Sequence, residues 1–294
     1  MSNRITKLLV FDGRLTPTDA DVYVSVYPAE VTSTTQVRGR LAGPSCPYAE
    51  TVEIAYPLRE FSREYASTGI PHITVRAVIP EPNWWHPDSP FLYRGPLELW
   101  QADQCCERRE LTHGLRVIRL GPAGFKVNGK VLSLCGVARD ALTADEARRW
   151  HDAGCNTLLA NVGPAGEELW ELADRYGFLM LGRIRQRSDY RQAAPVRKHP
   201  SHLGWLLDQA LLEDELVRAA LPTPADDKQG LGIELHSAPT APLPEQIGFV
   251  ACGEELFPEV MDLPLPVILL ARRPFQPAAE PAALDVLGTI FTGE

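Results

Sequence analysis

Seven polar residues follow apolar stretches in the second half of the chain, and they are the side chains best placed to do chemistry. They are Asp140, Asn161, Asp208, Glu234, His236, Glu254 and Glu255. Two carboxyl groups can share a reaction, one transferring a proton and the other attacking as a nucleophile. Asp208 and Glu254 are one such pair, provided that their carboxyl groups approach within about 5–10 Å. The alternative is that each acid is a solvated loop residue of an acidic chain.

Three histidines, His199, His202 and His236, suggest a metal site as an alternative. Histidines near loops more often only form hydrogen bonds. The six cysteines include no Cys-x-x-Cys spacing, and only Cys105 and Cys106 are close in sequence. Free thiols fit this pattern better than a zinc site or a disulfide framework. We therefore expect no metal and no cofactor.

The elements that must position these side chains alternate between strand and helix after Gly121. Residues 131–137, 157–160 and 178–181 are strand-like apolar runs. Thr143 and Glu146 have the spacing of a capping box, which predicts a helix that ends at Gly154. A second helix is expected over residues 167–176, with Gly177 as its C-cap. This order implies right-handed parallel crossovers.

Five more apolar runs bring the strand count to eight, the number needed for a closed barrel with its site at the carboxyl ends of the strands. They lie at residues 203–207, 231–235, 247–251, 267–270 and 284–290. A further helix is expected over residues 210–220. The later connections are short and rich in proline, as in residues 238–244 and 274–281, so we expect a trimmed barrel.

Residues 4 to about 120 have a different pattern, with short alternating runs separated by Pro, Gly and Ser. Examples lie at residues 22–27, 51–56, 73–79, 97–100 and 115–118. About seven such strands in a little over a hundred residues are typical of an immunoglobulin-like β-sandwich. We therefore predict a multidomain β plus α/β fold. An immunoglobulin-like β-sandwich over residues 1–120 is followed by a truncated (β/α)8 TIM-type barrel over residues 121–294.

Composition excludes some classes of function. The formal net charge of −9 argues against a nucleic-acid partner, because affinity for the phosphate backbone is built from Lys and Arg contacts. The apolar stretch near the N-terminus is too short for a signal peptide, and no run approaches the roughly 18 apolar residues of a membrane span. We expect a cytoplasmic protein that uses no membrane.

Three stretches carry a resemblance to a known family. Residues 85–93 read Trp-His-Pro-Asp-Ser-Pro-Phe-Leu-Tyr, residues 125–140 contain an Asn-Gly-Lys turn followed by Gly-Val-Ala-Arg-Asp, and residues 199–210 read His-Pro-Ser-His-Leu-Gly-Trp-Leu-Leu-Asp-Gln-Ala. They resemble glycoside hydrolase family 2, the β-galactosidase/β-glucuronidase-like enzymes. They match the signature of its central sandwich, its junction between sandwich and barrel, and its fourth barrel strand.

The resemblance also implies where the family's catalytic residues should lie. The third stretch is similar, without gaps, to a family pattern that ends in Asn-Glu, in which the Glu is the acid/base and the Asn contacts the substrate 2-hydroxyl. Gln209 and Ala210 stand at those positions. The nucleophile is expected after a later strand, and Ala271 is the nearest equivalent. Asn161 and Arg183 stand where the family has other pocket residues, so both the catalytic pair and the pocket are expected to be altered.

Four tryptophans could stack against sugar rings, since aromatic faces suit the apolar faces of pyranoses. They are Trp84, Trp85, Trp170 and Trp205. Core packing is the alternative, and it is favoured because Trp85 and Trp205 stand where the family itself has tryptophan.

Three hypotheses of function follow. The first is a catalytically inactive relative, a pseudoglycosidase that binds carbohydrate or serves a protein partner as a scaffold. The second is an active glycoside hydrolase with relocated carboxylates, which requires two acids to converge in a pocket at the carboxyl end of the barrel. The third is a structural subunit that oligomerises through uncovered strands or helices of the trimmed barrel.

Overall fold

The computed structural model describes residues 3–67, 69–121, 124–189, 198–214, 217, 230–273 and 286–293. The chain divides into two compact units. One comprises Met1–Trp85 and Ser89–Leu115, and the other comprises His86–Asp88 and Arg116–Glu294. The first unit thus ends at Leu115, whereas the predicted domain boundary follows residue 120.

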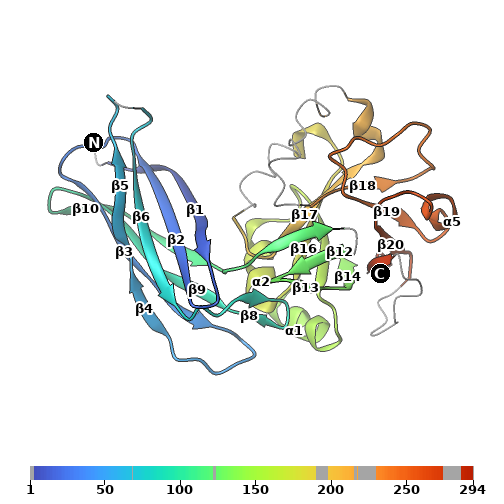
Figure 1. Ribbon diagram of the computed structural model, residues 1–294, viewed down its shortest axis with the longest axis horizontal. Coiled ribbons are helices and arrows are strands. Elements are labelled where there is room, and N and C mark those ends of the chain that lie inside the picture. The colour runs from blue at the N-terminus through green and yellow to red at the C-terminus, as the bar shows by residue number, and fades with distance from the viewer. Residues whose placement is uncertain are drawn as a thin grey trace. The chain divides into compact units, whose positions relative to one another are not determined.

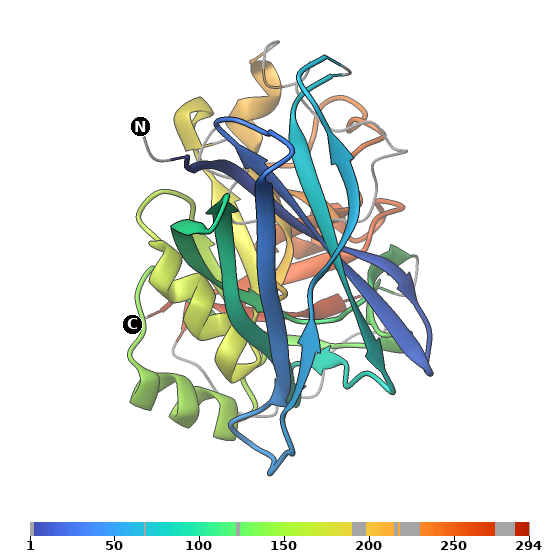
Figure 2. The same cartoon turned by 90° about the vertical axis from the view of Figure 1, so that its left-hand side faces the viewer.

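The first unit is a sandwich of two four-stranded antiparallel sheets, as predicted (Figure 1). One sheet has the order β1 (Ile5–Leu15), β2 (Asp19–Pro28), β6 (His72–Pro80), β5 (Arg59–Glu64). The other has the order β10 (Gln104–His113), β9 (Leu92–Gln101), β3 (Thr35–Ser45), β4 (Ile54–Pro57). Figure 2 shows the long strands of this unit in blue and cyan.

Alternation along the strands builds the core of the sandwich. In β2, Val22, Val24 and Val26 are fully buried, and in β6 the same holds for Ile73 and Val75. Every second side chain of each strand therefore points to the core, which is the period of two that the sequence pattern predicted.

Two predicted strands of this half differ from the observed ones. The run at residues 51–56 becomes a strand only from Ile54, where pairing with β3 begins at Gly43. Val52, before that point, is 83% exposed, so no core holds it in a sheet. In the run at residues 115–118 only Ile118 lies in a strand, because the carbonyl of Leu115 accepts a hydrogen bond from the backbone of Trp85 instead of pairing in a ladder.

Short elements precede the barrel. Two-residue strands form at β7 (Trp85–His86) and β8 (Ser89–Pro90). A small antiparallel sheet then follows, with the order β11 (Ile118–Gly121), β12 (Gly124–Val127), β13 (Lys130–Val131). Its last turn is formed by Asn128 and Gly129, with φ of 52° and 82°. Asn and Gly tolerate this left-handed backbone, which confirms the predicted hairpin.

The second unit is built on a closed barrel of eight parallel strands, which confirms the predicted strand count. In order they are β14 (Leu134–Ala138), β15 (Thr157–Asn161), β16 (Leu179–Ile184), β17 (His202–Asp208), β18 (Gly230–Leu235), β19 (Phe249–Gly253), β20 (Val267–Ala271) and β21 (Val286–Phe291). The last strand pairs with the first, so Leu134 lies beside Gly288 and closes the barrel. Strands β16, β17 and β18 are buried almost throughout, as expected for parallel strands covered on both faces.

In the described part of the chain, helices cover only part of this barrel, which is consistent with the predicted trimming. The longer ones that the structure describes are α1 (Ala144–Asp152) and α2 (Glu167–Tyr176). Thr143 and Glu146 form the predicted capping box of α1, and Gly177 ends α2 in a left-handed conformation. Short helical segments follow at η1 (Gln209–Glu213) and α5 (Phe257–Val260).

The helix predicted over residues 210–220 differs in part from the observed structure. The chain there forms the 3-10 helix η1 only as far as Glu213, and most of the remaining predicted segment lies outside the described residues.

None of the helices in the described part of the chain is long and apolar enough to cross a membrane.

Candidate functional site

A pocket of about 550 Å³ opens at the carboxyl end of the barrel strands. Six of the eight strand ends contribute to it, through Ala138, Arg183, Glu234, Gly253, Leu270 and Thr292. The loops after these strands and helix α5 add Arg185, His236, Glu255, Leu256, Glu259 and Arg272. Residues far apart in the chain meet here because parallel strands end at one rim of the barrel.

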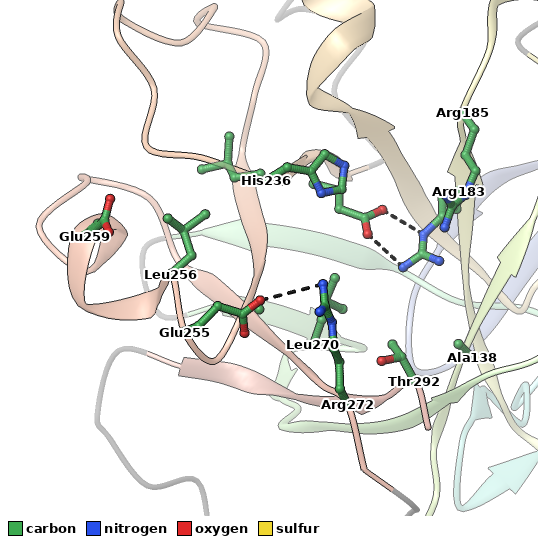
Figure 3. Close-up of a pocket in the computed structure, with 13 residues that line it drawn as sticks. Ala138, Arg183, Arg185, His236, Glu255, Leu256, Glu259, Leu270, Arg272 and Thr292 are labelled. Atoms are coloured by element: carbon green, nitrogen blue, oxygen red, sulfur yellow. Dashed lines mark hydrogen bonds and ion pairs between the residues drawn. The ribbon is translucent and has the colours of Figure 1, made fainter. Parts of the chain in front are cut away.

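The polar lining of the pocket includes an ion pair between Arg183 of β16 and Glu234 of β18 (Figure 3). Nε of Arg183 lies 2.8 Å from Oε2 of Glu234, and Nη2 donates a hydrogen bond of 3.0 Å to Oε1. Both side chains are buried, with 9% and 8% of their surface exposed. Burial lowers the pKa of the Arg183 guanidinium, and the neighbouring Glu234 acts in the opposite direction.

A second, looser ion pair lies at the rim of the pocket. Arg272, which follows β20, approaches Glu255 to 3.7 Å. Both side chains are largely exposed to solvent, so water screens this contact and it contributes little to stability. Glu259 on α5 also lines the pocket. Breaking the contact between Arg272 and Glu255 therefore costs little free energy, whereas the Arg183–Glu234 pair is buried and held in a fixed geometry.

Three predicted residues form a network where β17 and β18 end. Nε2 of His236 lies 3.1 Å from Oδ2 of Asp208, whose other oxygen accepts a hydrogen bond from the backbone of Ala210. Oε1 of Gln209 accepts hydrogen bonds from the backbone N–H groups of His236 and Ser237, at 2.8 and 3.2 Å. His236 lines the pocket, whereas Asp208 and Gln209 do not line it but contact His236 through its side chain and its backbone.

Two other predicted residues support an arginine of the pocket. Asp140 accepts hydrogen bonds from the backbone and the side-chain amide of Asn161, at 2.6 and 2.8 Å. Oδ1 of Asn161 in turn accepts from Nε of Arg185 at 3.0 Å. Asp140 and Asn161 do not line the pocket, but they orient Arg185, which does.

The two acids singled out as a reactive pair have separate partners. Asp208 contacts His236 and caps η1, whereas Glu254 accepts a hydrogen bond of 3.1 Å from Arg273. Neither of them is among the residues that line the pocket, although Glu255, next to Glu254, is. The acids that the barrel brings to the pocket are Glu234, Glu255 and Glu259.

The two alanines follow or end the fourth and seventh barrel strands. Ala210 is exposed in the first turn of η1, directly after β17. Ala271 is the last residue of β20 and is fully buried. The resemblance predicts carboxylates at these two places.

Comparison with known proteins supports the resemblance. No family model matches the chain. The β-galactosidase BoGH2A of Bacteroides ovatus is 26% identical over 121 residues, which cover 37% of this chain and 14% of that protein. A putative β-galactosidase of Bacteroides fragilis has a similar structure, with a TM-score of 0.69, 13% identity and coverage of 99% of this chain and 56% of that one. The fold is that of glycoside hydrolase family 2.

A second solved structure leads to the same conclusion. A glycosyl hydrolase family 2 member of Bacteroides cellulosilyticus has a TM-score of 0.66 and 15% identity, and the match covers 99% of this chain and 44% of that one. The chain therefore spans about half the length of these two solved structures, and the segment matched to the curated relative covers a seventh of that protein.

The histidines of this family 2 fold lie in different surroundings. Nδ1 of His199 is hydrogen-bonded to Asp174, and the ring of His202 stacks on Trp170. His236 is exposed beside Asp208. Within the described ranges, no three His, Cys, Asp or Glu side chains are grouped in a way that could hold a metal ion.

The tryptophans belong to packed cores and not to the pocket. Trp85, Trp170 and Trp205 are each at most 3% exposed. The ring of Trp205 lies where a side chain at Gly182 would have to stand. Trp84 packs against the sandwich core. Packing against the core, the favoured alternative, accounts for these positions.

The residues selected at strand ends were acids, an asparagine and a histidine, so Arg185 and Arg272 were missed, and Arg183 was named only through the family resemblance. Arg183, Arg185 and Arg272 all follow or end apolar strand runs, which is the same signal that selected Glu234 and His236. Extending the search at strand ends to cations would have found all three.

Proposed function

We propose that this chain is a catalytically inactive, family 2-like protein that binds carbohydrate in the pocket at the carboxyl end of its barrel. The observation that carries this proposal is Ala210, two residues after β17 ends, in a stretch that resembles the family pattern without gaps. A methyl group cannot transfer a proton, and positioned proton transfer contributes about 10²–10⁴-fold to such reactions.

Two further features support the proposal. Ala271 stands at the end of β20, where the resemblance expects the nucleophile, so the covalent route lacks its carboxylate. The one deeply buried acid of the pocket, Glu234, is already engaged by Arg183. The pocket itself persists, lined by charged side chains that can hydrogen-bond to hydroxyl groups.

Hydrolysis and binding assays on the purified chain test this proposal together. We expect no turnover above buffer on chromogenic β-galactosides, β-glucuronides or β-mannosides, and measurable binding of a sugar by calorimetry. Asp208→Asn, Glu254→Gln and Glu234→Gln are run beside the wild type. Turnover that any of these substitutions abolishes would overturn the inactive assignment and favour an enzyme with relocated carboxylates.

Restoring the carboxylates tests the positions themselves. The double variant Ala210→Glu/Ala271→Glu is expected to gain hydrolysis of at least one chromogenic substrate. Its matched control, Ala210→Gln/Ala271→Gln, has side chains of the same size without acid or nucleophile and should gain none. Equal turnover by both double variants would contradict the assignment of these positions.

A further inference from the structure

The buried ion pair of Arg183 and Glu234 is costly for a barrel that only needs to fold. Removing two charges from water costs several kcal/mol per ion, and replacing such a pair by apolar side chains is often neutral or stabilising. Both side chains are nevertheless more than nine-tenths buried and meet through two contacts, at 2.8 and 3.0 Å. Stability alone does not account for the pair, and both residues line the pocket.

The pair retains hydrogen-bonding capacity that a ligand could use. Arg183 contacts Glu234 through Nε and Nη2, so the two N–H groups of Nη1 are not used by this carboxylate. Oε1 of Glu234 accepts from Nη2 of Arg183 and has a second lone pair, whereas Oε2, in ion-pair contact with Nε, has no hydrogen-bond partner among the described residues. A donor and an acceptor thus lie side by side at the pocket in a fixed geometry.

The charges of the pocket indicate what kind of ligand suits it. Three arginines are balanced by three glutamates: Arg183, Arg185 and Arg272, with Glu234, Glu255 and Glu259. Two of the arginines are paired with two of these glutamates. The lining therefore offers no surplus of positive charge to an anionic ligand, and it offers donors and acceptors together to a neutral one.

We infer that the Arg183–Glu234 pair is a recognition element for two adjacent hydroxyl groups of a neutral sugar. One hydroxyl donates to a Glu234 oxygen, and the oxygen of its neighbour accepts from Nη1 of Arg183. This inference rests on the proposed carbohydrate binding and specifies its ligand class and its contacting residues. The pair takes no part in any reaction.

Calorimetry with the full chain tests the inference, using methyl β-galactoside, methyl β-glucoside, methyl β-mannoside and glucuronate as ligands. Glu234→Gln keeps the shape but removes the charge, and it should weaken binding of the preferred methyl glycoside about 10–100-fold. The double variant Arg183→Met/Glu234→Leu replaces the pair by apolar side chains. It should keep or raise the thermal midpoint and lose binding to the same extent or more.

A matched control lies on the sandwich. Arg63 and Glu60 form a similar two-contact pair, at 3.0 and 2.7 Å, outside the pocket. Arg63→Met/Glu60→Leu should leave sugar affinity unchanged. If the double variant of the pocket fails to fold, two other measurements test whether the pair contacts sugar. One is the titration of Glu234→Gln with sugar, and the other is the shift of the Arg183 Nε–H signal in the NMR spectrum of the wild type when sugar is added.

The outcomes separate the two proposals. No binding of any sugar by the wild type would overturn the proposed function itself. Binding by the wild type that both pocket variants retain, with no shift of the Arg183 signal, would overturn only the role of the pair. Tighter binding of glucuronate than of every methyl glycoside would overturn the neutral ligand class.

Discussion

Asp174 of α2 and His199 in the turn before β17 are joined by a hydrogen bond of 2.6 Å between Oδ2 and Nδ1, with only 4% of each side chain exposed. The other carboxylate oxygen of Asp174 accepts from the backbone of Ser201 at 2.9 Å. One acid thus ties a helix to the start of a barrel strand. The contact is part of the barrel wall and not of the pocket.

Asp174→Ala should destabilise the barrel strongly. It leaves a buried imidazole and a buried backbone N–H without their partner, so the free energy of unfolding should fall by about 3 kcal/mol. Urea unfolding followed by circular dichroism measures this. Asp152→Asn, at a side chain that is 75% exposed, is the control and should change little. A loss below about 0.5 kcal/mol for Asp174→Ala would show that the bond is dispensable.

Gly177 ends α2 with φ of 79°, and a Cβ there would collide with the carbonyl oxygen of Pro87. Gly177→Ala should therefore lower stability by about 3 kcal/mol, from the left-handed backbone and the collision together. Two other glycines separate these causes. Gly154 has φ of 87° but open space, so Gly154→Ala should cost about 1 kcal/mol. Gly166→Ala, with open space and an ordinary φ of −65°, should cost almost nothing. Equal losses at all three positions would contradict this explanation.

The capping box of α1 predicts a pH-dependent contribution to stability. Hydrogen bonds from the side chain and backbone of Thr143 lower the pKa of Glu146 below its ordinary value of 4.5. A lowered carboxyl pKa stabilises the fold above the ordinary value, and this contribution is lost as pH falls through the lowered value. The stability difference between wild type and Glu146→Gln should therefore be present at pH 7 and shrink below pH 4.5. A difference independent of pH would exclude the carboxylate as its source.

Thiol reactivity should follow burial. Burial raises the pKa of Cys155 to about 12 and that of Cys252 to about 11, and both side chains are buried. Cys105 is exposed. Iodoacetamide at pH 8 should therefore modify Cys105 in the folded protein and reach Cys155 and Cys252 only after unfolding in urea. Peptide mass spectrometry reports each site, and early modification of Cys155 would contradict its placement in the core.

Much of the secondary structure could be predicted from the sequence, because its signals are local. Thr143 and Glu146 lie three residues apart, and their bonds need only one turn of helix. The apolar runs in the barrel half each became strands because a buried parallel strand is apolar on both faces. The prediction from sequence was wrong where a strand depends on a neighbouring strand to pair with. Val52 was predicted to lie in a strand, but it lies just before the pairing of β4 with β3 begins.

The sequence by itself also determined which residues stand at or just after the ends of strands, including Ala210, Glu234 and His236. Only the tertiary structure decided which of these side chains meet. Glu254 and Glu255 are neighbours in the chain, yet only Glu255 lines the pocket, because successive residues leaving a strand point in different directions. Arg183 and Glu234 are 51 positions apart and form a buried pair, because closure of the barrel brings the ends of β16 and β18 to one rim.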